Sequence, residues 1–517
     1  MRIATLAILT ALGMTLTSGA VWSMTAPGEG DVVAANAPDE DSDPATSEGQ
    51  SSAGTSDQSD QSDQLPEPTV DKSTFLSGKT LMVEGRLGHS KMLADSDGET
   101  FLFVDVRGSG EDLGQGRFEP LNLAIVIDHS GSMKGQRERN ALDAAAGMIR
   151  RLRDGDTVSV VSYDAQARVV VPVTTISSST RERMIQTMVS SVGTRPSGNT
   201  CISCGIDLGM RTLEGRRPGI SRMLLLSDGE ANRGIQDVDG MRVLARQART
   251  RGVTISSIGV DVDYNERLMS AVAREANGRH YFSETGANLD QIFDQELDSL
   301  VSAVAKQAKL VVELAPGVRA AEIFDRSYNL VDRRVIVPMG TFAVNEQKTF
   351  LMRVELPASP TGERPIASVS LSYDDLTVGA PGECFGELAT RMTATPSEVA
   401  PLDAIVLGRL TRSETALALQ EANALFAAGK AGEAQGRISD HLAQLESRRE
   451  QAAEAEPVTA ADPFDRDLDQ EFAKQAGALD TANAAFGEAA ASPAPKKNRK
   501  SKAQVKLNAE AADALSL

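Results

Sequence analysis

Two different periods of apolar residues alternate along residues 121–308. Short apolar runs with the period of strands are followed by longer stretches whose apolar residues recur at helical spacing. The runs that predict strands are 121–127, 157–162, 167–173, 223–226, 253–260 and 279–282. The stretches that predict helices are 137–152, 180–189, 201–213, 238–251, 265–276 and 288–306. The alternation predicts one α/β domain with a doubly wound, mostly parallel sheet.

Segments with strand periodicity flank this domain on both sides, and turns such as Ala380-Pro381-Gly382 separate them. They lie at 80–87, 100–106, 310–314, 333–337, 348–356 and 366–373. The simplest arrangement is one β-sandwich built from residues 76–120 and 309–400, with the α/β domain, residues 121–308, inserted between them. Helical periodicity then predicts a helical region over 401–490 that packs on the sandwich.

Residues 1–20 have the layout of a secretory signal peptide. Arg2 precedes an apolar stretch from Ala4 to about Leu16, and the small residues Ser18-Gly19-Ala20 follow. Cleavage after Ala20 would export the chain to the periplasm, the cell surface or the medium of a bacterium. An uncleaved membrane anchor over residues 4–22 is the alternative.

Polar segments follow the signal peptide and end the chain. Residues 21–75 are rich in Ser, Asp and Gln and hold too few apolar residues to offset their ordering entropy, which predicts a disordered spacer. Such a segment either holds the folded part away from a surface or is a solvated tail without a specific role. The basic residues 496–502 predict a disordered tail over 491–517, which is either solvated or contacts an anionic surface or an acidic chain.

The composition of the chain constrains both its cores and its partners. Hydrophobic residues make up 41% of the chain, which is enough for real cores, but aromatic residues make up only 4%, so the cores are expected to be aliphatic. The formal net charge of -19 argues against nucleic acid as the main partner, because nucleic-acid binding depends on a surplus of basic side chains.

Five residues with side-chain oxygens stand where predicted parallel strands end, or in a loop between them. Asp128, Ser130 and Ser132 follow the first strand, Thr200 lies in a Gly/Asn loop, and Asp228 follows the fourth strand. Ligand crevices of open parallel sheets lie at the carboxyl ends of the strands. Carboxylates and hydroxyls at that edge suit a hard divalent cation, which prefers oxygen ligands.

These five positions resemble the metal-ion-dependent adhesion site of von Willebrand factor type A domains. The Asp-x-Ser-x-Ser element alone is a weak signal, but a Thr about 70 residues later and a strand-terminal Asp-Gly about 28 residues beyond it make the combination specific. Residues 80–399 together look like bacterial secreted proteins whose type A domain is similar to that of calcium-activated chloride channel regulators.

The resemblance implies how the site would work. Ser130, Ser132 and Thr200 would offer hydroxyls to Mg²⁺, or to Mn²⁺ or Ca²⁺, while Asp128 and Asp228 would act partly through bound water. Two carboxylates neutralise a divalent ion, and one coordination position remains for an Asp or Glu carboxylate of a protein or glycoconjugate partner. The implied function is metal-dependent protein interaction of the adhesion type, without catalysis.

Other interpretations of the same residues remain open. The serines could cap the helix that follows them, and Asp228-Gly229 could be an ordinary turn. A metal-dependent hydrolase, or a redox enzyme with a Cys-x-x-Cys motif, could use the same pocket. The sequence contains no His-Glu-x-x-His motif, no Gly-x-Ser-x-Gly elbow and no phosphate-binding loop, so we expect no enzyme.

The chain has three cysteines, and two of them follow Thr200 directly. Cys201 and Cys204 stand at the predicted start of a helix, where thiolates are stabilised and where redox-active pairs occur. Three alternatives remain open at this stage: a structural disulfide that holds the metal loop, two free thiols, and a catalytic redox pair.

Overall fold

The computed structural model describes residues 71–110, 119–191, 198–216, 218–455, 462, 464, 466–490 and 499–516. All of them belong to one unit of the chain, Pro68–Leu517. The predicted signal peptide and the predicted spacer as far as residue 70 lie outside the described residues. The end of the predicted spacer is a correction, because the first strand, β1, already begins at Thr74 and pairs with the next strand.

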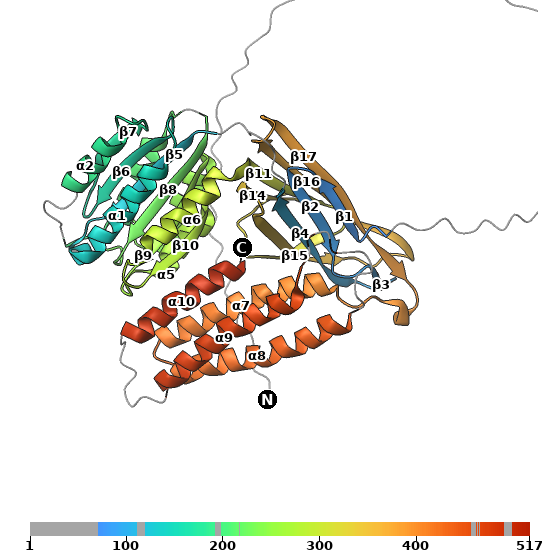
Figure 1. Cartoon of the computed structure of the whole chain (residues 1–517). Coiled ribbons are helices and arrows are strands. Elements are labelled where there is room, and N and C mark those ends of the chain that lie inside the picture. The colour runs from blue at the N-terminus through green and yellow to red at the C-terminus, as the bar shows by residue number, and fades with distance from the viewer. Residues whose placement is uncertain are drawn as a thin grey trace, which may run out of the picture. The chain divides into compact units, whose positions relative to one another are not determined.

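An α/β domain with a six-stranded sheet occupies the middle of the chain (Figure 1). The strand order is β10-β9-β8-β5-β6-β7, and all neighbours are parallel except β6 and β7. The strands are β5 (Leu121–Asp128), β6 (Thr157–Tyr163), β7 (Ala167–Thr175), β8 (Ile220–Ser227), β9 (Val253–Val260) and β10 (Asn277–Ser283). The helices are α1 (Gln136–Arg151), α2 (Arg181–Ser191), α3 (Ile202–Leu213), α4 (Val238–Thr250), α5 (Glu266–Glu275) and α6 (Leu289–Val301). The predicted α/β fold is therefore confirmed.

Strand β5 lies at the centre of this sheet and is buried along its whole length. Alternate residues enter different cores: Leu123 and Ile125 pack with α1, α2 and α6, whereas Ala124 and Val126 pack with α3, α4 and α5. A strand that is covered on both faces needs a continuous apolar sequence, which is why residues 121–127 lack the polar alternation of a surface strand.

Strands from both sides of the α/β domain form two further sheets. One has the order β1-β2-β4-β15-β12 and the other β13-β14-β11-β16-β17-β3. Their strands are β1 (Thr74–Gly78), β2 (Leu81–Leu87), β3 (Lys91–Leu93), β4 (Gly98–Gly108), β11 (Ala303–Leu314), β12 (Arg319–Phe324), β13 (Asn329–Val331), β14 (Arg334–Ala343), β15 (Gln347–Leu356), β16 (Gly362–Asp375) and β17 (Ala380–Thr393). Residues of both sheets, such as Val104 and Val369, share one apolar core, as in a β-sandwich.

The border between the α/β domain and the second flank differs from the prediction. A helix was expected over residues 288–306, but α6 ends at Val301 and β11 begins at Ala303. Val304 and Ala308 are buried in the core of the two flanking sheets rather than against the α/β sheet. Tertiary burial therefore overrides the helical spacing of these few apolar residues.

Among the described residues, the helices that follow the sandwich are α7 (Ala404–Ala427), α8 (Ala431–Glu454), α9 (Leu468–Ala490) and α10 (Arg499–Ser516). Ile405, Val406 and Leu410 of α7 pack against Phe103 and Leu351 of the sandwich. None of the helices in the described part of the chain is long and apolar enough to cross a membrane.

Helix α10 corrects the prediction of a disordered tail over 491–517. It packs against α7 and α9 and also against β10 and α5 of the α/β domain (Figure 1). Ala503 is buried in the core beside α5, and Ala512 is buried among α7, α8 and α9. The basic residues that suggested a solvated tail stand at the start of a helix whose small apolar residues are covered by distant parts of the chain.

Helix α3 approaches the central sheet closely, and this approach places the loop before it. A methyl group on Gly205 would lie 2.7 Å from Cδ1 of Tyr163 and 3.0 Å from Cγ1 of Val126. Glycine is therefore the residue that fits between this helix and the strands β5 and β6. The loop that holds Thr200 leads directly into this helix.

We expect Gly205→Ala to lower the free energy of unfolding by about 1–3 kcal/mol, because the added methyl group would displace Tyr163 or Val126. Gly147→Ala is the matched control, since Gly147 also lies inside a helix and nothing stands within 4 Å of the added carbon. That control should be neutral or slightly stabilising. Urea unfolding of the two variants measures the difference, and equal stabilities would contradict the close-packing argument.

Candidate metal centre

Two neighbouring parallel strands bring the predicted carboxylates together. Strand β5 ends at Asp128, and β8 ends one residue before Asp228. The two strands are paired in register from Leu121 with Ile220 to Ile127 with Leu226, so their carboxyl ends lie side by side. The edge of the sheet therefore carries both carboxylates, as the spacing predicted.

The serines after β5 turn their hydroxyls toward Asp228. The hydroxyl oxygens of Ser130 and Ser132 are 2.9 Å apart. Oδ1 of Asp228 accepts hydrogen bonds from Ser132 Oγ at 2.8 Å and from Ser130 Oγ at 3.3 Å. Asp128 holds the turn, because its Oδ1 accepts from the backbone N–H of Ser130 at 2.8 Å and its Oδ2 from Ser227 Oγ at 2.9 Å.

Thr200 joins this group from a separate loop. A methyl group on Gly229 would lie 3.6 Å from Thr200 Oγ1 and 3.9 Å from Ser132 Oγ, so both hydroxyls face the same small space beside the glycine. The backbone N–H of Thr200 donates to Asn232 Oδ1 at 2.8 Å, which ties this loop to the loop that follows Asp228. The structure thus brings all five predicted residues, called the oxygen cluster below, to one edge of the sheet.

The two carboxylates of the cluster carry an electrostatic penalty. Asp128 and Asp228 are 0% and 1% exposed. Burial, followed by repulsion from Asp228, raises the pKa of Asp128 to about 7. Burial also raises the pKa of Asp228, although hydrogen bonds from Ser132 and Arg137 oppose the rise. A cation between these carboxylates would offset the repulsion.

The residues present fit a hard divalent cation. The cluster offers two carboxylates and three hydroxyls, and it contains no nitrogen or sulfur ligand. No group of three or more His, Cys, Asp or Glu side chains suited to a metal occurs among the described residues, so an ion held here would depend on the hydroxyls. Ser132 is exposed whereas Ser130 and Thr200 are buried, so solvent reaches the cluster from the Ser132 side.

Two charged residues next to the cluster were missed by the sequence interpretation. Arg137 of α1 donates to Asp228 Oδ2 at 3.2 Å and to the carbonyl oxygen of Ser132 at 3.0 Å. Its other terminal nitrogen pairs with Asp261, which directly follows β9. The rule that selected Asp228 could have found Asp261, because both are acidic residues at the ends of adjacent parallel strands.

Comparison with known proteins identifies the domain that carries the cluster. The model of the family "von Willebrand factor type A domain" matches residues 122–295, which include the oxygen cluster. Residues 122–295 are a von Willebrand factor type A domain. We refer to them below as the type A domain.

The regions in which this chain matches its relatives are longer than the type A domain. An uncharacterized protein of Synechocystis, sll0103, is 27% identical over 272 residues, which are 50% of this chain and 63% of that protein. The uncharacterized protein YfbK of Escherichia coli is 28% identical over 221 residues, or 42% of this chain and 37% of that protein. The chain thus spans less than two thirds of the length of these relatives.

A solved structure shares more of the architecture. The von Willebrand factor type A protein from Catenulispora acidiphila has a TM-score of 0.64 and 16% sequence identity. The likeness covers 83% of this chain and 96% of that chain, so it includes elements outside residues 122–295. At this identity the likeness is evidence on the fold alone.

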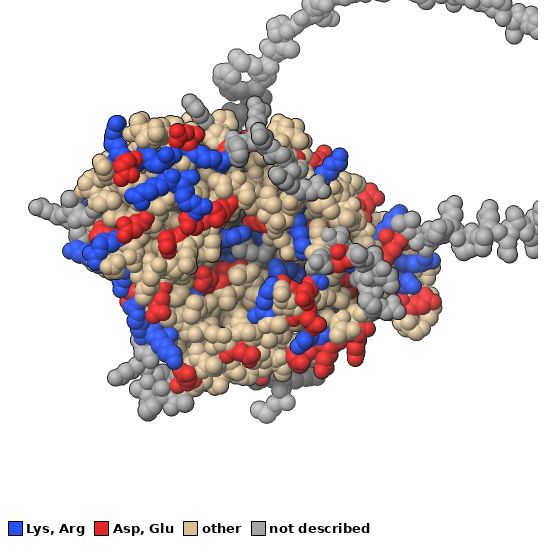
Figure 2. Space-filling model, viewed as in Figure 1, with Lys and Arg blue, Asp and Glu red and all other residues tan. Residues whose placement is uncertain are grey.

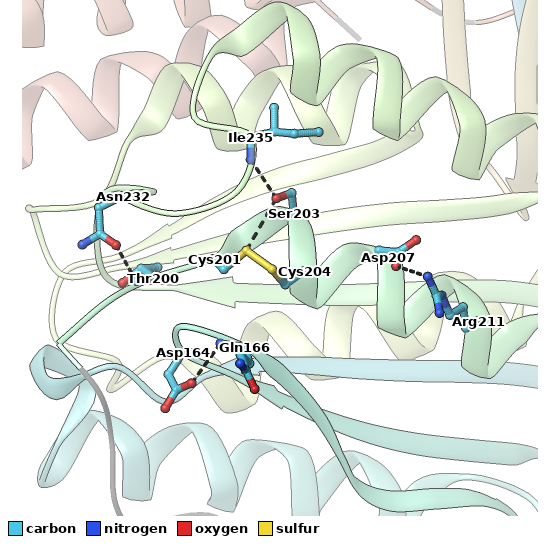
Figure 3. Close-up of a disulfide and its surroundings, with 10 residues drawn as sticks. All are labelled: Asp164, Gln166, Thr200, Cys201, Ser203, Cys204, Asp207, Arg211, Asn232 and Ile235. Carbon is cyan, nitrogen blue, oxygen red and sulfur yellow. Dashed lines mark hydrogen bonds and ion pairs between the residues drawn. A yellow bond between two sulfur atoms is a disulfide. The ribbon is translucent and has the colours of Figure 1, made fainter.

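Of the three alternatives for the cysteine pair, the structure contains the disulfide. Figure 3 shows Cys201 and Cys204 bonded at the start of α3, directly after Thr200. The Oγ of Ser203 accepts from the backbone N–H of Ile235 at 3.0 Å, so the first turn of α3 is also tied to the loop after β8. The disulfide and this hydrogen bond both fix the backbone that directly follows Thr200.

We predict that the contribution of Asp128 to the stability of the metal-free protein in EDTA falls as the pH rises from about 4 to about 7. The folded pKa of Asp128, about 7, lies above its ordinary value of 3.8, so its stabilising contribution is full below 3.8 and is lost as the pH rises through the folded pKa. Urea unfolding as a function of pH measures the loss. Asp128→Asn should flatten this dependence, and an unchanged dependence in that variant would contradict the assignment.

We predict that reduction of the Cys201–Cys204 disulfide weakens Mg²⁺ binding roughly tenfold, because the loop of Thr200 loses a constraint. Calorimetric titration with and without reductant measures the change. The Cys201→Ser/Cys204→Ser variant should bind like the reduced protein and ignore reductant, whereas Cys384→Ser, at the buried free cysteine, should respond like the wild type. Identical affinities of oxidised and reduced wild type would disprove the link.

Proposed function

We propose that this chain is a divalent-metal-dependent protein-interaction protein of the adhesion type, which binds an acidic group of its partner at the oxygen cluster. The observation that carries the proposal is the convergence of two carboxylates and three hydroxyls at one edge of the type A domain. On this proposal, the five residues of the cluster form a complete metal-ion-dependent adhesion site, and the cation is Mg²⁺, Mn²⁺ or Ca²⁺.

Each residue of the cluster has a role in this proposal. Ser130, Ser132 and Thr200 present neutral oxygens, and Asp128 and Asp228 balance the charge of the cation. When bound, the cation supplies a positive centre that an Asp or Glu carboxylate of a protein or glycoconjugate can ligate. Ser132 is exposed, so such a group can reach the cluster from that side. Asp128 is buried, so its carboxylate is held in place beneath the cluster.

The distribution of charge on one face of the molecule supports a protein partner. On the face shown in Figure 2, basic and acidic side chains are interspersed. Such a mixed surface suits local recognition of an acidic group better than binding of a uniformly charged polymer.

We further propose that the protein is exported to the cell envelope or the medium. The signal-like residues 1–20 support export, and the Cys201–Cys204 disulfide suits an oxidising compartment. The combination of a type A domain with flanking β-strands supports placing the chain among the bacterial secreted proteins that resemble calcium-activated chloride channel regulators in this domain.

The direct test is calorimetric titration of the full chain with Mn²⁺ and Mg²⁺. We expect one bound ion per chain, and we expect Asp128→Asn and Asp228→Asn to weaken binding at least about tenfold. Asp239→Asn, at a side chain of α4 that is 89% exposed, is the matched control and should bind like the wild type.

The interaction itself is tested by crosslinking in intact cells, followed by recovery of the tagged chain in Mg²⁺ or in EDTA. The same partner should be retained by the wild type in Mg²⁺ and lost in EDTA and in Asp128→Asn. Retention that survives both treatments would show that partner binding does not use the metal.

A further inference from the structure

A chain of alternating charges leads away from the oxygen cluster. Asp228 accepts from Arg137, Arg137 pairs with Oδ2 of Asp261, and Oδ1 of Asp261 lies 2.6 Å from Nη1 of Arg499. These residues come from the loop after β8, from α1, from the end of β9 and from the first residue of α10. The chain therefore connects a candidate metal ligand with the C-terminal helix.

Arg137 is placed so that it competes with a cation for Asp228. Its guanidinium occupies Oδ2 of that carboxylate, while Oδ1 faces the serine hydroxyls. A divalent ion held by the cluster would feel the nearby positive charge and would share the carboxylate with it. Both effects lower the affinity for the ion. The side chain of Arg137 is 29% exposed, so screening by salt reaches it only in part.

Asp261 offers Arg137 a second carboxylate. Its side chain is 3% exposed, and the backbone N–H of Val262 donates to its Oδ1 at 2.7 Å, so this carboxylate is fixed at the end of β9. Asp261 attracts Arg137 and so weakens the pairing of Arg137 with Asp228. This attraction is stronger when no other cation neutralises the charge of Asp261. Arg499 takes up part of that charge at the same carboxylate.

Helix α10 delivers Arg499 to this place through several other contacts. Lys502 pairs with Asp263, and Lys506 pairs with Glu266 and donates to the carbonyl oxygen of Tyr264 at 2.7 Å. The first two turns of α10, from Arg499 to Lys506, thus contact the single segment that follows β9. On its other side, the backbone of α10 is bound to α7, since Asn423 donates to the carbonyl oxygen of Val505 at 3.0 Å.

We propose that Arg137 is a built-in counter-ion that weakens cation binding, and that docked α10 strengthens this effect through Arg499 and Asp261. The inference rests on the proposed metal-binding function and adds a means of regulation to it. Any partner that draws α10 away from the type A domain would raise the affinity of the cluster for its cation. The affinity therefore depends on the C-terminal helix, which lies more than two hundred residues from the cluster in the sequence.

The test is calorimetric titration of full-length variants with Mn²⁺. Arg137→Gln should bind roughly tenfold more tightly than the wild type, because a positive charge beside Asp228 is removed. Arg137→Lys, which keeps the charge, should stay near the wild type. Asp261→Asn should bind several-fold more weakly, because Arg137 loses its second carboxylate, and this loss should vanish when Arg137→Gln is also present.

The part played by α10 has its own variant and control. Arg499→Gln should bind Mn²⁺ several-fold more tightly than the wild type. Lys500→Gln removes a neighbouring charge on the same helix whose partner is Glu488 of α9, and it should leave the affinity unchanged. Arg151→Gln, at the far end of α1, is the corresponding control for Arg137. Thermal unfolding in EDTA checks that each variant is folded.

The possible results distinguish a failure of the proposed regulation from a failure of the proposed metal binding. Equal Mn²⁺ affinities of the wild type and Arg137→Gln would overturn the counter-ion, and equal affinities of Arg499→Gln and Lys500→Gln would overturn the coupling to α10. Both results would leave the metal site in place. If the wild type binds no Mn²⁺, or binds it as tightly as Asp128→Asn, the proposed function itself fails.

Discussion

The parallel pairing of β5 with β8 is the constraint on which the site depends. Strand β5 is buried along its whole length, and β8 is buried from Arg222 onward, so the runs that lead to their carboxyl ends, residues 123–127 and 223–226, are apolar. Because neighbouring parallel strands end at the same edge, Asp128 and Asp228 are forced together although 100 positions separate them in the sequence. Helices on both faces hold the two strands in this register.

This arrangement brings two buried carboxylates close together, and neighbouring side chains offset the resulting repulsion. Two buried carboxylates repel each other, and hydrogen bonds from serine hydroxyls and from Arg137 reduce the repulsion. The two buried carboxylates make the cluster suitable for a divalent cation, and without a cation their repulsion destabilises the fold. Arg137 next to such a cluster therefore stabilises the protein without metal, and on our proposal it also weakens metal binding.

The β-sandwich and helix α10 both contact the type A domain, the sandwich at the two ends of the domain and α10 at the segment after β9. The β-sandwich is built from segments before and after the domain, so the domain's two ends enter a shared β core. Helix α10 returns to the segment after β9, beside the oxygen cluster. The oxygen cluster is thus connected by direct ion pairs to a helix that lies far from it in the sequence.

The α/β fold and the residues of the oxygen cluster could be predicted from the sequence, because buried strands have a local apolar pattern and the cluster residues stand at the spacing of a known motif. The sequence did not determine the end of α6, the helical state of residues 499–516, or the roles of Arg137, Asp261 and Arg499. Those depend on which distant surface covers a few small apolar side chains and on which charges meet across loops. Such pairings are decided by the tertiary structure, since no local period in the sequence records them.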